Sequence, residues 1–333
     1  MSSIRMDIAQ VHALIAAALI RSCTSERNAA SVATALVEAE LAGQGGHGLR
    51  RVAAYAAQAK TGKVDGFATP ALERPRPALV AVDVSNGFAF PALDLAFDPL
   101  SECARSQGVA LAGFRRSHHC GVAGVIVERY AKTGLVALMF ANTPSAMAPW
   151  GSGHALFGTN PIAFAVPVAG ADPLVIDVSL SKVARGKIMA ANQKGQAIPP
   201  DWAFDIDGTP TTDASAALAG TMAPVGDAKG TALALMVELL AAGLTGANYA
   251  YEATSFLDAK GAPPGVGQLI VCIDPSAFAS NILERFASMA AMVESAPGAR
   301  LPGRRRQSLK DTLLKEGIPV DKALLAEIEA LGR

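Results

Sequence analysis

The stretch that decides the fold is Gly43-Gln44-Gly45-Gly46-His47-Gly48, because it matches the G-x-G-x-x-G pattern of dinucleotide-binding proteins. In those proteins the glycines follow a buried strand and open a helix whose first amides hold a pyrophosphate. Here the preceding segment, Ala30 to Leu41, is rich in Ala and Glu and has a helical pattern. A Rossmann domain is therefore disfavoured. We interpret the glycines as the end of a helix that admits a ligand beside His47.

The segments before and after this stretch alternate between helical and strand-like patterns. Apolar residues recur at helical spacing over 8–18, and Thr24 and Ser25 are candidate caps for the helix that follows. Beyond Gly66, helical patterns alternate with short β-rich runs, at 78–84, 109–114, 135–141, 174–178 and 268–273. This alternation predicts an α/β core.

The C-terminal part returns to a helical pattern. The apolar period runs from Ile282 to Val293, breaks at the basic segment 301–306, and resumes at Ser308 and Asp321. We predict a helical N-terminal module over 1–72, a cofactor-binding and catalytic α/β core over 73–282, and C-terminal helices over 283–333 that pack with the N-terminal module.

Composition excludes several classes of protein. Twenty-nine Lys and Arg balance twenty-nine Asp and Glu, so the chain lacks the basic excess of a nucleic-acid binder. No apolar run reaches the ~18 residues of a membrane span, and the N-terminus has no signal-peptide pattern. Four scattered cysteines fit a reduced compartment, so we expect the cytoplasm. The apolar fraction of 51%, with only 17% charged residues, suggests a homodimer.

His47 and Arg51 are the first candidate site residues. If Gly48 starts a helix, the two side chains share a face and combine a proton donor with a clamp for a carboxylate. A helix cap and a solvated arginine explain the same segment about equally well.

The segment Ser117-His118-His119-Cys120-Gly121 offers three types of metal ligand in a row. Adjacent residues seldom point at one ion, so we expect no metal here. A strand-to-helix turn, with Gly121 and Gly124 at a helix start that could receive phosphate, is favoured. A buried pair of histidines is the alternative.

Three further segments carry polar groups near strand or helix ends. Thr159 and Asn160 precede an apolar run, and a simple turn explains them equally well. Ser179 and Ser181 follow the strand-like run that contains Asp177, where they could cap a helix. Lys229 lies in a Gly-rich loop without the full Walker spacing, which disfavours phosphate transfer.

Together, these segments resemble the malate, lactate and ureidoglycolate dehydrogenase family, whose nicotinamide-binding fold is not a Rossmann fold. The resemblance covers nearly the whole chain in the family's order, through GGHGLRR (45–51), SHHCGVAG (117–124), FGTNPIAFAVP (157–167), LVIDVSLSKVARGKI (174–188), PPDWAFDIDGTPTTD (199–213), GDAKG (226–230) and LPGRRR (301–306). Two segments, 237–246 and 263–275, are most similar to the branch that reduces Δ1-piperideine-2-carboxylate and Δ1-pyrroline-2-carboxylate. The resemblance implies a central mixed, largely antiparallel sheet flanked by a helical module from both chain ends.

The family resemblance also implies roles for individual residues. His47 would be the general acid with Lys187 near it, Arg51 would grip the substrate carboxylate, and Thr159 would touch substrate. The resemblance implies NADPH as the cofactor, with NADH as the alternative. The residues implied to contact it are His119, Cys120, Gly121, Val175, Ile176, Asp177, Val178, Ser179, Leu180, Ser181, Ala228, Lys229, Gly303, Arg304 and Arg305. Gly46 stands where the family usually has serine, and we expect a backbone or space requirement there.

The sequence therefore predicts an enzyme that reduces cyclic imino acids to proline and pipecolate. Hydride would reach the carbon that bears the carboxylate, and His47 would supply the proton. A 2-hydroxy-acid dehydrogenase of the same family is the first alternative, and a catalytically inactive binding or scaffold protein is the second.

Overall fold

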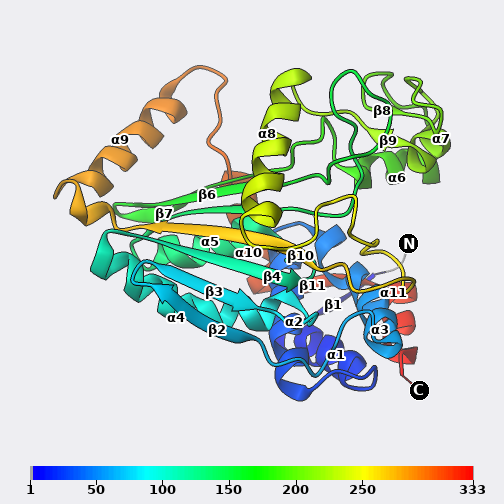
Figure 1. The fold of residues 1–333 in the computed structure, drawn as a ribbon, viewed down its shortest axis with the longest axis horizontal. Coiled ribbons are helices and arrows are strands. Elements are labelled where there is room, and N and C mark those ends of the chain that lie inside the picture. The colour runs from blue at the N-terminus through cyan, green and yellow to red at the C-terminus, as the bar shows by residue number, and fades with distance from the viewer. Residues whose placement is uncertain (1–2, 333) are drawn as a thin grey trace.

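The computed structural model describes residues 3–332, apart from the side chain of Arg305. Its centre is a seven-stranded sheet of order β2-β3-β4-β10-β5-β6-β7 (Figure 1). Neighbouring strands are antiparallel except β3 and β4, which run parallel. The predicted mixed, largely antiparallel sheet is confirmed. Its strands are β2 (Ala71–Arg76), β3 (Leu79–Asp83), β4 (Val109–Ser117), β5 (Val136–Ala141), β6 (Ile162–Val168), β7 (Ala171–Val178) and β10 (Val266–Ile273).

Helices cover both faces of this sheet. On one face lie α4 (Ala89–Gln107) and α5 (Ala123–Lys132), whose buried apolar side chains join the main core. On the other face lies α8 (Ala228–Glu238), which continues into a π-helical turn, Leu239–Gly243 (Figure 1).

The two chain ends form one module. β1 (Ser3–Met6) pairs antiparallel with β11 (Ile318–Asp321), and Arg21 donates to the carbonyl oxygen of Leu331. The helices of the module are α1 (Ile8–Ile20), α2 (Glu26–Leu41), α3 (Val52–Thr61), α10 (Arg304–Glu316) and α11 (Lys322–Ala330). Ser25 caps α2 as predicted, whereas the Thr24 hydroxyl is buried and has no hydrogen-bond partner within the described structure.

The C-terminal helices depart from the sequence prediction in one respect. The helix that we expected to resume at Ser308 already begins at Arg304, so the basic triplet is its first turn and not a break. The preceding helix, α9 (Ile282–Ser295), lies beside β6 and projects from the sheet (Figure 1). The boundaries after residues 72 and 282 stay a prediction.

The structure has a small additional lobe that the sequence patterns did not predict. It holds α6 (Arg185–Gln193), β8 (Ala203–Phe204), α7 (Ala214–Ala219) and β9 (Thr221–Met222), and it has an apolar cluster of its own. In Figure 1 this lobe lies at the upper right, beside the end of α8 that carries Lys229. Among the described residues no helix is long and apolar enough to cross a membrane.

Candidate active site

His47 lies in the loop that joins α2 to α3. The prediction that glycines end a helix here is confirmed, because α2 stops at Leu41 and Gly43 adopts φ +72°. The loop then forms a 3-10 turn, Gly45–His47. The carboxylate of Glu40 accepts a hydrogen bond of 2.7 Å from the amide of Leu49, which ties this loop back to α2.

Arg51 reaches the same loop, but not along a continuous helix. Gly48 separates two 3-10 turns and α3 begins only at Val52, so the predicted shared helical face is wrong. Instead, the Arg51 Nε atom donates to the carbonyl oxygen of Gly46 at 2.8 Å. Its Nη1 atom is buried without a hydrogen-bond partner among the described residues. A buried cationic nitrogen of this kind is suited to an incoming carboxylate.

His47 forms a pair with His119, which follows β4. His47 Nδ1 lies 3.0 Å from His119 Nε2, and the two rings are stacked with centroids 5.0 Å apart. On its other side His119 Nδ1 lies 2.5 Å from the hydroxyl of Tyr55, on α3. No sequence pattern singled out Tyr55 as a site residue. It stands four residues after Arg51, and side chains at this spacing lie on one face of a helix.

The electrostatics of this pair favour neutral rings. Burial, and then the Arg51 charge, lower the pKa of His47 to about 4. The same two causes hold the pKa of His119 well below its ordinary value. At neutral pH His47 is therefore an uncharged imidazole in the free protein.

The histidine segment is buried, as its alternative interpretation predicts. His118 is 1% exposed and His119 is 6% exposed. The helix start that could receive phosphate is already used by the protein, because the amide of Gly124 donates to the Asp177 carboxylate at 2.8 Å. Within the described chain, no group of three or more His, Cys, Asp or Glu residues could hold a metal.

The next two predicted cofactor contacts lie at the same turn. Burial raises the pKa of the Cys120 thiol to about 12, so this cysteine is an inert thiol. Gly121 adopts φ +73°, and a Cβ atom at this position would lie 3.0 Å from Cε1 of Phe90. Their contact with a cofactor stays a prediction.

Thr159 is held by a buried polar network that the sequence did not reveal. Its amide donates to the hydroxyl of Thr143 at 3.0 Å. The next residue, Asn160, is fully buried and donates to the carboxylate of Glu238 at 2.7 Å. Asn142 donates to the same carboxylate at 3.0 Å. This network fixes the loop that carries Thr159 against α8 and β5.

The segment 175–181 ends the edge strand β7. The serines do not cap α6, whose first residue follows Ala184, because Ser179 and Ser181 hydrogen-bond to each other at 3.1 Å. Leu180 is buried, while Val178 is 47% exposed. Gly303, with φ +85°, lies against the backbone of Val175 and so joins two of the predicted cofactor segments.

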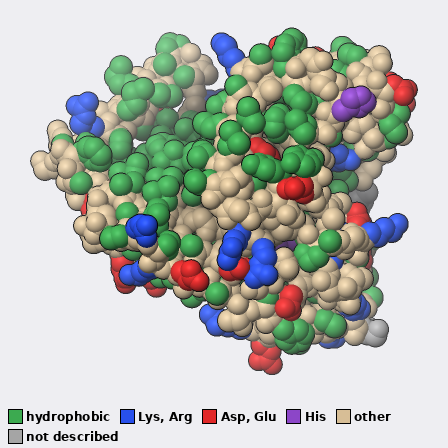
Figure 2. Space-filling view, in the orientation of Figure 1, with side chains coloured by type: hydrophobic (Ala, Val, Ile, Leu, Met, Phe, Trp, Pro, Cys, Tyr) green, Lys and Arg blue, Asp and Glu red, His purple; other side chains and the backbone are tan. Residues whose placement is uncertain are grey.

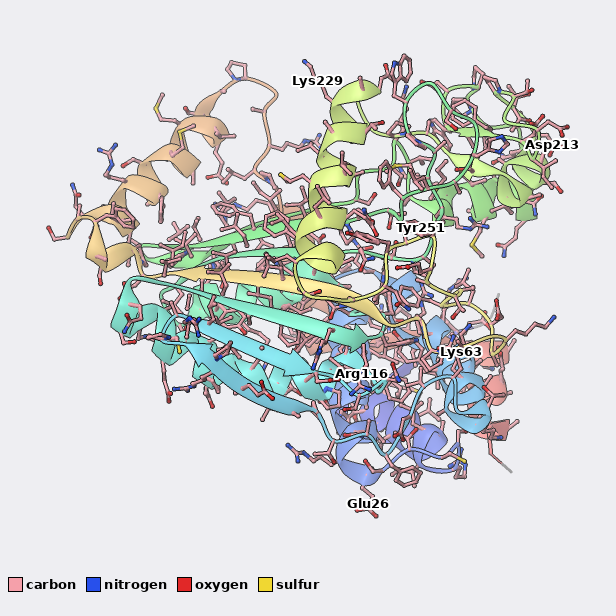
Figure 3. All side chains as sticks on the ribbon, viewed as in Figure 1. Glu26, Lys63, Arg116, Asp213, Lys229 and Tyr251 are labelled. Atoms are coloured by element: carbon pink, nitrogen blue, oxygen red, sulfur yellow. The ribbon has the colours of Figure 1, made fainter. Side chains whose placement is uncertain are left out.

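Charged side chains predicted to join the site lie on the surface. Lys187 is exposed on α6, and no described hydrogen bond or ion pair links it to His47. Lys229 extends from the first turn of α8 into solvent (Figure 3). Arg304 forms an ion pair of 2.6 Å with Glu294. The side chain of Arg305 lies outside the described part of the chain.

Comparison with known proteins agrees with this architecture. The malate/L-lactate dehydrogenase family model matches residues 6–329. The chain belongs to this family. It is 46% identical over 325 residues to the (2R)-3-sulfolactate dehydrogenase (NADP(+)) of Chromohalobacter salexigens, covering 98% of this chain and 97% of that protein.

Two further relatives carry reductase names. The Δ1-pyrroline-2-carboxylate reductase of Ancylobacter novellus is 36% identical, covering 99% of this family member and 98% of the relative. The crystal structure of Δ1-piperideine-2-carboxylate reductase from Pseudomonas syringae superimposes with a TM-score of 0.94 at 36% identity, covering 98% and 99% of the two chains. The protein is a nicotinamide-dependent oxidoreductase of this family.

Proposed function

We propose that this protein transfers hydride at the carbon next to a carboxylate, interconverting a 2-hydroxy acid and its 2-oxo acid. The observation that carries the proposal is the pair formed by His47 and Arg51, and the 46% identical (2R)-3-sulfolactate dehydrogenase favours a 2-hydroxy acid as the substrate. The Nη1 atom of Arg51 is buried and has no hydrogen-bond partner in the described part of the chain, and it lies beside an imidazole that is neutral at physiological pH. The segment between α2 and α3 therefore carries both a group that can bind a carboxylate, Arg51, and a group that can transfer a proton, His47.

The two side chains act in sequence on a bound acid. Burial is the main cause of the low pKa of His47, and the Arg51 charge is the second; a substrate carboxylate on Arg51 would offset this second cause and so raise the affinity of His47 for a proton. In the oxidative direction His47 accepts the hydroxyl proton, and in the reductive direction it returns that proton to the oxygen. The nicotinamide, when bound, supplies or accepts the hydride.

The residues around β7 fit a dinucleotide. No other strand of residues 3–332 pairs with the outer edge of β7, so the backbone groups of this edge can hydrogen-bond with the carboxamide of a nicotinamide. A side chain at Gly303 would fill the space over Val175. We propose that the segment 175–181, Gly303 and the first turn of α8, with Ala228 and Lys229, hold the cofactor. Arg304 follows Gly303, and although its Nε atom is paired with Glu294 its side chain is 60% exposed; we propose that its remaining N–H groups bind the 2′-phosphate of NADPH, which favours NADPH over NADH.

A cyclic imino acid is the second candidate substrate, and it is the first hypothesis from the sequence. The reductase relatives at 36% identity favour it. The same two side chains serve this reaction, because the carboxylate binds Arg51 and His47 faces the nitrogen. An imine nitrogen is more basic than a ketone oxygen. Reduction of an imine therefore depends less on proton donation by His47.

A substrate panel separates these candidates. We would follow NADPH and NADH oxidation with sulfopyruvate, pyruvate, oxaloacetate, Δ1-pyrroline-2-carboxylate and Δ1-piperideine-2-carboxylate. The proposal expects kcat/KM to be at least tenfold higher for one of the 2-oxo acids than for either imine. Preference for an imine supports the second candidate, and no turnover with any of them refutes both.

The homodimer predicted from composition remains a proposal with structural support. Figure 2 shows apolar side chains gathered over α8, α9 and the strands between them. Leu239 and Leu244 follow α8 at 51% and 64% exposure, and Met289 and Met292 on α9 are 65% and 67% exposed. Apolar patches of this kind mark subunit contacts. Light scattering at micromolar concentration should give twice the chain mass, and a monomer would contradict the proposal.

We also propose a cytoplasmic location. All four cysteines are free thiols, and three of them are buried, which is typical of proteins from reducing compartments.

A further inference from the structure

We propose that Glu238, the last residue of α8, is a positioning residue that holds the hydroxyl of Thr159 where a bound acid can reach it. The inference rests on the proposed function, because it requires an acid to bind at the site of His47 and Arg51. It gives a role to a buried carboxylate that the reaction itself does not use.

The order of the strands places Thr159 at the same end of the sheet as the histidine pair. His119 follows β4, Thr159 precedes β6, and the cofactor segment 175–181 ends β7. The residue pairs that join the ends of these strands are Ser117 with Val266, Gln268 with Ala141, Phe140 with Ile162, and Ile162 with Val178. The loop of Thr159 therefore lies between the strand that leads to His119 and the segment proposed to hold the cofactor.

The backbone of Thr159 is tied down, while its side chain is free. Its amide donates to the hydroxyl of Thr143 at 3.0 Å, and its carbonyl oxygen accepts from the amide of Leu180 at 2.8 Å. Gly158 and Asn160 on either side are buried, but Thr159 is half-buried. Its hydroxyl makes no hydrogen bond within residues 3–332, so it is available to a bound acid.

Glu238 holds the next residue of this loop. Asn160 is fully buried and adopts φ +39°, a strained conformation for a residue with a side chain. Its Nδ2 atom donates to the Glu238 carboxylate at 2.7 Å and to the carbonyl oxygen of Ala234 at 3.0 Å. Both acceptors lie on α8, so these bonds fix the loop to that helix and maintain the strained conformation.

The surroundings of Glu238 suit a carboxylate. Its side chain is buried, and its other oxygen accepts from Asn142 Nδ2 at 3.0 Å and from the amide of Ala250 at 2.6 Å. Burial raises the pKa of Glu238, and the three hydrogen bonds oppose that rise. Because all three neighbouring groups are donors, the ionised form satisfies each of them.

Glu238→Gln disturbs this match without changing the shape of the side chain. The glutamine oxygen can still accept from Asn142 and Ala250, but its amide group then faces Nδ2 of Asn160, so two donors meet. Asn160 cannot compensate by turning its amide, because Nδ2 also donates to Ala234. The substitution therefore releases Asn160, and with it the loop that carries Thr159.

Steady-state kinetics with the preferred acid of the substrate panel test this role. Glu238→Gln should raise KM for the acid about three- to tenfold, which corresponds to one lost hydrogen bond, and lower kcat less. The affinity for NADPH should change little. Thr159→Val removes the hydroxyl itself, so the double variant should have the same KM as Thr159→Val alone. An unchanged KM in Glu238→Gln, or additive effects in the double variant, would overturn the proposal.

Asn28→Ala is the matched control for a general loss of stability. Asn28 is another buried asparagine, and it donates to the carbonyl oxygens of Gly66 and Ala68. This variant should lower the melting temperature and leave KM in place. An equal rise of KM in Asn28→Ala would show that lost stability, and not the position of Thr159, is the cause.

Amide hydrogen exchange tests the positioning without a substrate. In Glu238→Gln, peptides over 157–162 and 178–182 should exchange faster, because they contain the amides of Thr159 and Leu180. If Glu238→Gln does not fold, Asn160→Gly should show the same changes, since glycine tolerates this φ and also loses both bonds to α8. Unchanged exchange would overturn the inference even if the enzyme acts as proposed. If no acid of the panel is turned over, the proposed function fails and faster exchange still supports the role of Glu238 in the loop.

Discussion

Arg51 donates from Nε to the carbonyl oxygen of Gly46, 2.8 Å away, and so binds the residue next to His47, while its own Nη1 is buried with no partner among residues 3–332. One side chain thus orients the histidine loop and offers a site for a carboxylate. The first prediction therefore concerns this arginine.

Arg51→Lys should raise KM for the acid substrate at least tenfold and lower kcat less. A lysine cannot reproduce both the bond to Gly46 and a second, parallel contact with a carboxylate. The control is Arg50→Lys, since Arg50 is exposed on the same turn. Steady-state kinetics over a range of acid concentrations measure both constants. An unchanged KM in Arg51→Lys would place the carboxylate elsewhere.

His47→Ala should lower kcat by ~10² or more, the usual contribution of a positioned acid or base. Cofactor affinity, measured by NADPH fluorescence titration, should change little. His154→Ala, at an exposed position in the loop between β5 and β6, serves as the control for general effects of losing a histidine. Near-wild-type turnover of His47→Ala would remove this residue from the reaction.

Gly46→Ser should be tolerated. We expected a backbone or space requirement at Gly46, but its φ is not in the left-handed region and a Cβ there would meet nothing within 4 Å. The expectation of a conformational requirement within the protein is therefore wrong. Stability should stay within about 0.5 kcal/mol of wild type, and activity should hold or rise by up to about tenfold.

The matched control for this substitution is Gly48→Ser. A Cβ at Gly48 would collide with the Glu40 carboxylate, so this variant should lower the melting temperature. A clear loss of stability in Gly46→Ser would contradict the open space that the structure shows.

Acid should destabilise the protein through its buried histidines. Burial lowers the pKa of His118 to about 3, and that of His47 is about 4, whereas both titrate near 6.5 when unfolded. Between pH 6.5 and 4 the unfolded chain therefore binds more protons, and the free energy of unfolding falls as pH falls. For His47 alone the loss is about 2 kcal/mol at pH 5.

Urea unfolding at pH 7.5, 6.5, 5.5 and 4.5 measures this loss. His118→Asn should show a shallower fall than wild type, because it removes one of the groups that the unfolded chain protonates. His154→Asn, at the exposed histidine, should run parallel to wild type. Parallel curves for His118→Asn and wild type would contradict the buried, neutral state of His118.

The sequence predicted the parts of this fold that depend on local pattern. The apolar period of α1, the cap at Ser25 and the β-rich runs 109–114 and 268–273 each appear where the pattern places them. The resemblance also indicated that both chain ends share a module, which the pairing of β1 with β11 confirms.

What the sequence could not show depends on contacts between distant segments. Tyr55 and His119 are 64 positions apart, and no spacing rule joins them. The ion pair between Arg304 and Glu294 likewise appears only when α9 and α10 are placed together. Asp177 lies near the end of β7, as the strand pattern predicts, and only the fold shows that its carboxylate accepts a hydrogen bond from the amide of Gly124 in the first turn of α5.

Isotope transfer tests the central claim most directly. NADPH carrying deuterium at C4 of the nicotinamide would be incubated with the best acid of the substrate panel, and the product examined by ²H nuclear magnetic resonance. We predict one deuterium at the carbon that bears the carboxylate, formed at least ~10² more slowly by His47→Ala. Product formation without deuterium at that carbon would contradict hydride transfer at this site.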